Sequence, residues 1–356
     1  MCSISTGNKN TQDKIDDGIY PFYVRSQTVE RINSWTFDGE AILTAGDGVG
    51  VGKVFHHTYG KIGVHQRVYI LSDFKCDANY LFHFFSSKFY NRVKRMSAKN
   101  SVDSVRKEMI TDMPLSLPSH QEQVKIGYLL SLLDERIATQ SKIIDKLQSL
   151  IKGLNDSLYA QYGDKVLTSF AELGTSYSGL SGKSAQDFGS GKPFITYLNV
   201  YSNNVINEND FQYVAIKNGE KQNIVEYGDV LFTLSSETPE EVGIGSVYLG
   251  KEKVYLNSFC FGIHITNMEV AFPPYLSYYV SSTAFRKFIY PYAQGSTRFN
   301  LCKADFEKAS IKLPTLENQK RIYSILSHID SKIETEIQML NLYNSQKQYL
   351  LRQMFI

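Results

Sequence analysis

The sequence has almost no net charge, few cysteines and no long apolar run. Its 38 lysine and arginine residues nearly balance 36 aspartate and glutamate residues, a net charge of +2, so any surface that binds nucleic acid must be local. The four cysteines, Cys2, Cys76, Cys260 and Cys302, form no CxxC pair and no disulfide framework, which favours a reduced cytoplasm. No run approaches the roughly 18 to 20 apolar residues that span a bilayer, and the first ten residues lack the apolar core of a secretory leader. We therefore predict a cytoplasmic protein without membrane contact.

The chain contains an internal duplication. Residues 117–137, LPSHQEQVKIGYLLSLLDERI, align with residues 313–333, LPTLENQKRIYSILSHIDSKI, at a constant offset of 196. Upstream the match continues with small gaps, back to residues 21–22 and 193–194. A chain of 356 residues, 42% of them hydrophobic, is long enough for two domains with separate cores. The sequence therefore predicts a tandem repeat of one fold.

Each copy predicts a strand-rich globule with one helix near its end. Short β-branched and aromatic runs such as AILTA, RVYIL, DVLFTL and FGIHIT are bounded by Gly, Asn and Asp, as strands are. Residues 79–95 and 274–289 place apolar side chains at helical spacing, and we interpret their aromatics as core residues rather than a stacking surface for bases. The predicted fold class is therefore α+β.

A long helix is predicted after each Leu-Pro dipeptide. Apolar residues recur there in alternating steps of four and three, the heptad pattern of a coiled coil. Because a single helix cannot bury such a stripe alone, we predict that the two helices, each about 38 residues and roughly 57 Å long, pair as an antiparallel coiled coil. The alternative is that each helix packs only on its own globule. The predicted pairing positions, with one polar layer in each helix, are Ile126, Leu130, Leu133, Ile137, Gln140, Ile144, Ile322, Leu326, Ile329, Ile333, Glu336 and Leu340.

Three motifs invite an enzymatic assignment, and each lacks a residue that the chemistry needs. GDGVGVGK at residues 46–53 lacks the glycine spacing of a phosphate-binding loop and is followed by Val54 instead of Ser or Thr, so we interpret it as a tight turn between strands whose N–H groups could face a phosphate. The FPPY motif is similar to the Asn-Pro-Pro-Tyr motif of amino-methyltransferases, but its Phe272 cannot accept a hydrogen bond from a target amine. Three histidines between positions 56 and 65, with Cys76, lack the close spacing of zinc ligands. We therefore predict no catalytic site and no metal site.

Both copies share the pattern LPxxxxQxxIxx(L/I)Lxx(L/I)DxxI between a variable globule and a long helix. The residues that match it are Leu117, Pro118, Gln123, Ile126, Leu129, Asp134 and Ile137 in the first copy, and Leu313, Pro314, Gln319, Ile322, Ile325, Asp330 and Ile333 in the second. This arrangement resembles the specificity (S) subunit of type I restriction-modification enzymes over essentially the full chain. Residues 20–33 and 42–55 also look like target-recognition sequence.

The resemblance implies a non-catalytic DNA-recognition subunit without a cofactor of its own. Each globule would read half of a bipartite site in double-stranded DNA. The paired helices would space the halves and dock two modification (M) subunits, which use S-adenosylmethionine, and restriction (R) subunits with ATP and Mg would join through the M complex. The implied segments are a first target recognition domain at 1–118, a central conserved helix at 119–160, a second target recognition domain at 161–314 and a distal conserved helix at 315–356.

The first recognition domain departs from the second at its start. About 22 residues separate Gly182 from the preceding helix, whereas six residues precede the matching Gly7. We therefore expect the first recognition domain to lack its N-terminal start.

Basic residues are unevenly distributed between the globules. Residues 1–118 carry a net charge of +3 and residues 160–314 one of −2. Seven basic residues between 88 and 107 accompany the single acid Asp103, which suits phosphate contacts, although a solvated helix face is an equal alternative. In the polar loop GSTRFN, Arg298 can bind guanine bidentately and Asn300 can do the same with adenine, so this loop is the preferred base-reading candidate. The predicted DNA contacts are Arg25, Lys53, Arg67, Lys94, Arg95, Lys99, Asn100, Arg106, Lys183, Ser296, Thr297, Arg298 and Asn300.

Two other functional classes stay open at this point. A stand-alone DNA methyltransferase or nuclease is disfavoured by the incomplete motifs, and a coiled-coil adaptor without a DNA role is disfavoured by the duplicated recognition-like globules. The DNA target itself does not follow from the sequence, because base readout depends on side-chain geometry and DNA shape.

Overall fold

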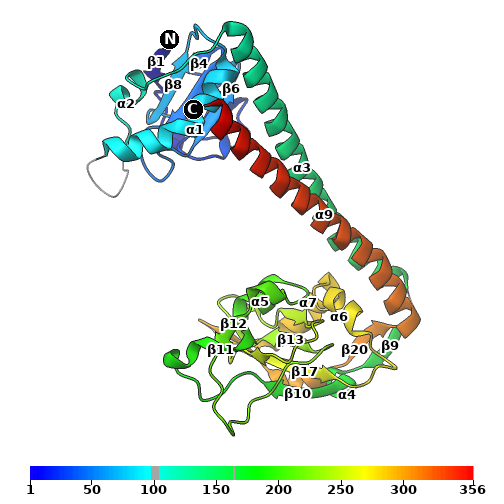
Figure 1. The fold of residues 1–356 in the computed structure, drawn as a ribbon. Helices are drawn as coiled ribbons and strands as arrows, with labels where there is room; N and C mark the ends of the chain where they lie inside the picture. The colour runs from blue at the N-terminus through cyan, green and yellow to red at the C-terminus, as the bar shows by residue number, and fades with distance from the viewer. Residues whose placement is uncertain (98–103, 163–164, 356) are drawn as a thin grey trace. The chain divides into compact units, whose positions relative to one another are not determined.

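The computed structural model describes residues 1–97, 104–162 and 165–355, which form two units (Figure 1). Unit 1 comprises Met1–Lys142 and Ile337–Ile356, and unit 2 comprises Ile143–Glu336. Each unit therefore holds one globule and part of both long helices. This division cuts through the helices, so the four-segment division made from the sequence stays a prediction. In the described parts of the chain, no helix is both long enough and apolar enough to cross a membrane.

Unit 1 is built on two sheets and two helices. An antiparallel sheet has the order β1-β8-β5-β6, from β1 (Ser3–Thr6), β5 (Ala41–Ala45), β6 (Phe55–Thr58) and β8 (Val68–Ser72). A second sheet has the order β3-β2-β7-β4, from β2 (Tyr20–Tyr23), β3 (Val29–Ile32), β4 (Phe37–Asp38) and β7 (Lys61–Val64). The helices are α1 (Ala78–Met96) and α2 (Lys107–Thr111).

The core of unit 1 lies on both faces of β5, whose five residues are all buried. Ile42 packs with Phe85 and Phe89 of α1, while the adjacent Leu43 packs with Ile62 from the second sheet. Successive side chains of a strand point to opposite faces, so the apolar run AILTA serves two cores at once.

Unit 2 repeats this plan. Its main sheet has the order β10-β17-β13-β15, from β10 (Gly174–Ser178), β13 (Val230–Thr233), β15 (Gly245–Val247) and β17 (Cys260–Ile265). Its second sheet, β12-β11-β16, consists of β11 (Phe188–Ile195), β12 (Gln212–Val214) and β16 (Tyr255–Leu256). The helices α5 (Tyr197–Ser202), α6 (Pro273–Tyr279), α7 (Thr283–Ile289) and α8 (Lys303–Lys308) complete the globule.

Further strands lie at the edges of unit 2. A small sheet has the order β14-β19-β18, from β14 (Ser235–Ser236), β18 (Ala293–Gln294) and β19 (Phe299–Leu301). Another pair joins β9 (Lys165–Thr168) to β20 (Ile311–Pro314), with the short helix α4 (Phe170–Leu173) after β9.

The register of the second sheets confirms the duplication. Phe22 pairs with Gly63 between parallel strands β2 and β7, and Phe194 pairs with Tyr255 between parallel strands β11 and β16. In unit 2, β9 and α4 precede the main-sheet strand β10.

One predicted helix is divided in the structure. The sequence predicted a single helix over 274–289, but α6 ends at Tyr279 and α7 begins at Thr283. The hydroxyl of Ser282 accepts the N–H of Phe285 and so caps a new helix. The corresponding residues of unit 1 lie inside the continuous α1, which confirms the other predicted helix.

The two long helices are α3 (His120–Gln161) and α9 (Leu316–Met354), and they pair antiparallel as predicted. In unit 1, Arg136 of α3 donates a 2.8 Å hydrogen bond to the hydroxyl of Tyr343 of α9, and Asp134 pairs with Lys347 further along α9. All the predicted pairing positions are buried or half-buried, including the polar Gln140 and Glu336.

Candidate nucleic-acid interface

A glutamine ties each long helix to its globule. Gln123 accepts the backbone N–H of Asp77 at 3.1 Å and donates to the carbonyl of Pro118 at 2.8 Å. Gln319 accepts the N–H of Phe272 at 2.8 Å and donates to the carbonyl of Pro314, in its own Leu-Pro dipeptide, at 2.8 Å. Each glutamine thus joins the start of α1 or α6 to the start of a long helix. The FPPY motif at residues 272–275 therefore forms the N-terminus of α6, where it has a structural role.

A second tie joins the aspartate of each repeat to the same globule helix. In unit 1, the imidazole of His83 on α1 lies 3.8 Å from the carboxylate of Asp134, and burial lowers the pKa of His83 to about 4. In unit 2, Tyr278 of α6 donates its hydroxyl hydrogen to Asp330, whose pKa is raised by burial. These contacts anchor the helices against the globules at equivalent positions.

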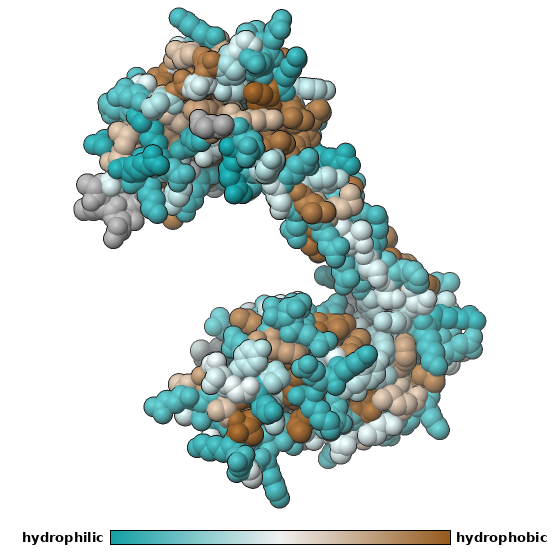
Figure 2. All heavy atoms as spheres, viewed as in Figure 1, coloured by the Kyte–Doolittle hydropathy of each residue, from teal (hydrophilic) through white to brown (hydrophobic). Residues whose placement is uncertain are grey.

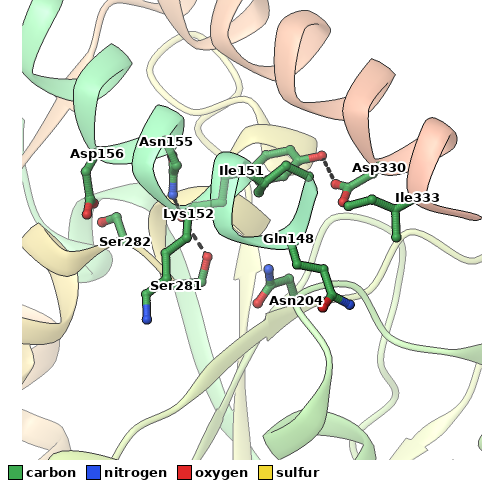
Figure 3. A pocket seen from close by; sticks show the side chains of 11 residues that line it. Gln148, Ile151, Lys152, Asn155, Asp156, Asn204, Ser281, Ser282, Asp330 and Ile333 are labelled. Carbon is green, nitrogen blue, oxygen red and sulfur yellow. Dashed lines mark hydrogen bonds between the residues drawn. The ribbon is translucent and has the colours of Figure 1, made fainter. Parts of the chain in front are cut away.

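The tie in unit 2 borders a cavity of about 320 Å³ between α3 and the globule (Figure 3). Asn155 of α3 donates to the carbonyl of Tyr278 at 2.8 Å, and Asp156 accepts the N–H of Thr283 at 2.9 Å. Two side chains on one helical turn therefore hold the end of α6 and the start of α7.

The end of α1 carries exposed positive charge, as predicted. Lys94 and Arg95 are exposed, and Arg106 is exposed with one guanidinium nitrogen 3.3 Å from the carbonyl of Met96. Arg92 instead holds α1 to α2 through a 2.7 Å hydrogen bond to the carbonyl of Met109. The predicted contacts Lys99 and Asn100 lie outside the described residues.

A second group of predicted contacts surrounds the glycine-rich loop. Asp47 is 2.8 Å from Arg25 and 3.6 Å from Arg67, while Lys53 lies over the ring of Tyr90. Residues 46–54 connect the antiparallel strands β5 and β6, so the segment lies between strands as predicted. Its tip residue Val49 is 97% exposed. The loop therefore presents an apolar tip beside two arginines.

The histidines of unit 1 have separate partners. His56 contacts the carbonyl of Ser26 at 3.1 Å, and His57 contacts Glu40 at 2.9 Å. His65 accepts the N–H of Arg67 at 3.0 Å. Over the ranges that the structure describes, no group of three or more His, Cys, Asp or Glu residues is placed to hold a metal ion.

The preferred base-reading loop is a tight hairpin between β18 and β19. Gly295 has a φ of +145°, and a Cβ there would lie 2.1 Å from the carbonyl oxygen of Arg298. Ser296, Thr297 and Arg298 are exposed at the turn, whereas Asn300 is exposed on β19 and pairs with β14. The backbones of Gly295 and Arg298 thus approach closely, which only glycine allows, and the segment is a tight turn instead of an open loop.

Lys183, a predicted DNA contact, makes its polar contacts within unit 2. Its side chain is only 5% exposed, and its ammonium group bonds the carbonyl of Ala215 at 2.6 Å and the carboxylate of Glu220. The ammonium group lowers the pKa of Glu220 to about 2. We therefore remove Lys183 from the candidate interface, because moving it to DNA would leave this ion pair broken.

Sequence reasoning missed Arg286, which shapes the loop beside the hairpin. Its guanidinium donates to the carbonyls of Glu240, Val242 and Gly243 at 2.6 to 2.8 Å. Burial lowers the pKa of Arg286. Since these carbonyls lie more than 40 residues before Arg286, no local pattern could have indicated the contact.

Two globules of one design, each joined by a glutamine to a pair of antiparallel helices, define a duplicated α+β protein. The family model described as the type I restriction modification DNA specificity domain matches residues 1–149 and 172–342. The chain belongs to this family, and both the resemblance and the fold class predicted from the sequence are confirmed.

Relatives of this chain include specificity subunits. The type I restriction enzyme EcoDI specificity subunit of Escherichia coli is 27% identical over 152 residues, 43% of this chain. That match spans only 33% of the relative's own length. The S subunit of a type I restriction-modification system from M. genitalium is similar in fold, with 15% identity, a TM-score of 0.62 and coverage of 100% of this chain and 94% of that chain.

A second similar structure is described as the structural basis of complex assembly and conformational transition of the type I R-M system. It has 15% identity and a TM-score of 0.57, and the match covers 92% of this chain and 83% of that one.

Proposed function

We propose that this chain is the DNA-recognition subunit of a type I restriction-modification system, with each globule reading half of a bipartite target. The observation that carries the proposal is the hairpin of unit 2, where Arg298 is exposed at the tight turn and Asn300 is exposed on the adjoining strand β19. Both side chains can pair bidentately with base edges in the major groove, Arg298 as a double donor to guanine and Asn300 as donor and acceptor to adenine. In unit 1, Arg25, Lys53 and Arg67 form a candidate edge around the glycine-rich loop, and Lys94, Arg95 and Arg106 supply phosphate contacts.

The long helices support a second part of the proposal, the docking of two M subunits. Leu129 on α3 is 44% exposed and its counterpart Ile325 on α9 is 41% exposed, so each repeat presents the same apolar position to solvent. Apolar patches are visible on the surface of the helical region (Figure 2). Val124, Tyr128 and Leu132 on the same helix as Leu129 are also exposed, and an exposed apolar patch of this kind supports a protein interface. Two equivalent positions fit two copies of one partner.

The chemistry would then belong to the partners. M subunits would bring S-adenosylmethionine and methyl transfer, and R subunits, joining through the M complex, would bring ATP and Mg. This chain would supply sequence choice and spacing without a cofactor of its own.

Methylome mapping with the cognate M subunit, with and without this gene, tests the proposal. We expect a bipartite methylated motif that is present only when the gene is expressed. An unchanged methylome would refute the recognition role. Tight one-to-one binding of S-adenosylmethionine by the isolated chain would favour the stand-alone methyltransferase instead.

A further inference from the structure

The aspartate that both repeats share has different partners in the two units. In unit 1, Asp134 of α3 forms an ion pair with Lys347 of α9, and His83 lies 3.8 Å from the same carboxylate. In unit 2, Asp330 accepts the hydroxyl hydrogen of Tyr278, the counterpart of His83. No Lys, Arg or His among the described residues forms an ion pair with Asp330. Within the described part of the chain, the second carboxylate therefore has no cation like that of the first.

One difference between the repeats accounts for this. The offset of 196 that relates the copies places Ile151 of α3 at the position that Lys347 holds in α9. Ile151 and Asp330 line the same cavity in unit 2, as this equivalence requires (Figure 3). Isoleucine is apolar and shorter than lysine, so it cannot supply an ammonium group to the carboxylate.

The cavity, about 320 Å³ in volume, offers an occupant both apolar and polar contacts. Ile151 and Ile333 give it an apolar wall near Asp330. Asn155, which also lines the cavity, is only 4% exposed. Its amide nitrogen donates to the carbonyl of Tyr278, whereas its Oδ1 has no hydrogen-bond partner among the described residues. Because a buried acceptor without a partner is costly, this oxygen favours an occupant that donates hydrogen bonds.

The charges around Asp330 favour a positive occupant. Of the described residues that line the cavity, Lys152 is the basic one, and its ammonium group lies on the side of Ser281, away from Asp330 (Figure 3). The pKa of Asp330 is raised by burial, lowered by the hydrogen bond from Tyr278 and raised again by the charge of Glu334. A cation at this end of the cavity would therefore relieve an unbalanced negative charge.

We propose that this cavity binds a small aliphatic amine in its protonated form. Asp330 would hold the ammonium group, Ile151 and Ile333 would contact the methylene chain, and Oδ1 of Asn155 offers a further acceptor. An ammonium group has three N–H donors and no acceptor, which suits these oxygens. A cavity of about 150 Å³ is enough to hold benzene, so this one has room for a short alkyl chain. A lysine side chain of another protein has the same chemistry, and the test separates the two sources. This inference goes beyond DNA recognition, which requires no amine here.

The test uses the full chain and n-butylamine, which is the lysine side chain as a free molecule. We expect saturable binding by ligand-detected NMR, at least tenfold tighter than that of n-butanol, the uncharged analogue. Asp330→Asn is expected to weaken amine binding at least tenfold, whereas Glu269→Gln, which removes an exposed carboxylate of unit 2, leaves it unchanged. The peptide acetyl-Gly-Lys-Gly-amide is expected to bind more weakly than n-butylamine. Tighter binding of the peptide would assign the cavity to a lysine of another protein and overturn the proposal.

Substitutions on α3 provide an independent arm. Ile151→Lys gives unit 2 the lysine that unit 1 has, so we expect it to abolish amine binding and to raise the temperature of thermal unfolding. Lys152→Met is expected to keep amine binding. The proposal is overturned if n-butylamine does not bind the parent chain at millimolar concentration, if n-butanol binds equally well, or if Ile151→Lys still binds the amine. It is also overturned if binding appears only in Lys152→Met, since Lys152 would then be the occupant.

The two arms protect the test against a folding defect. Ile151→Lys and the comparison with n-butanol remain decisive even if Asp330→Asn does not fold. Neither DNA binding nor methylation is measured, so failure of the proposed function would be seen separately.

Discussion

At the scale of single residues, Arg298 and Lys94 occupy settings that predict different effects on DNA recognition. Arg298 is exposed at a hairpin turn held by Gly295, and Lys94 is exposed near the end of α1. We expect Arg298→Ala to relax one half-site, because a bidentate base contact discriminates by about 1–3 kcal/mol. We expect Lys94→Ala to weaken binding evenly and lower the salt slope by about 1, as loss of a phosphate contact does. Methylome sequencing and salt titration of DNA binding measure the two effects. Unchanged specificity in Arg298→Ala would remove that residue from the reading surface.

The buried His83 predicts a pH dependence of stability. Its folded pKa of about 4 is below the ordinary 6.5, chiefly because burial disfavours the charged form. Asp134 opposes this shift, whereas the charges of Lys347 and His57 add to it. Between these pH values the unfolded chain binds a proton that the folded chain does not, so the free energy of unfolding falls as pH falls, by up to roughly 3 kcal/mol.

His83→Gln is expected to remove this part of the pH dependence, whereas His328→Gln, at an exposed position of α9, is expected to keep it. Urea denaturation at pH 7 and pH 4.5 measures the difference. Equal losses of stability in His83→Gln and the parent protein would show that His83 is not the group involved.

The repeated residues were predictable from the sequence, but most of their partners were not. Gln123 and Gln319 are visible as one position of a duplicated pattern. Their ties to the globules depend on backbone groups that lie 46 and 47 residues earlier, and a backbone N–H leaves no mark in a sequence. The ion pair of Lys183 was not predictable for a similar reason, since its partner Glu220 is 37 residues away.

At the scale of elements, the heptad pattern predicted the long helices well because pairing along a helix is periodic and local. The division between α6 and α7 was not predictable from apolar spacing, since the same spacing continues across it. Ser282 caps α7, but unit 1 has Ser86 and Ser87 at the same place within the continuous α1, so the serines alone do not cause the break. Local propensity is therefore overridden by packing in one copy.

The exposed apolar positions of the helices yield a prediction about assembly. We expect Leu129→Asp or Ile325→Asp to lose one of two bound M subunits, and the double variant to lose both, because each position lies in a different repeat. Lys142→Asp, at an exposed polar position of α3, is the control for charge alone. Native mass spectrometry of the reconstituted complex counts the M subunits. Full binding of two M subunits by the double variant would place the docking surface elsewhere.

At the scale of the whole molecule, we predict that the two long helices set the distance between the two recognition surfaces. The seam repeats every seven residues in both helices, so removing one heptad from each keeps the remaining seam in phase. Deleting residues 140–146 together with 336–342 would shorten each helix by about 10 Å. One turn of DNA is about 34–36 Å long, so this change is a sizeable fraction of a turn. We expect the methylated motif to keep both half-sites with a shorter spacer, or methylation to be lost because the two surfaces no longer match the groove. Circular dichroism and thermal unfolding check that the shortened chain folds. A folded variant that still methylates the original motif with its original spacer would show that the helices do not set the spacing.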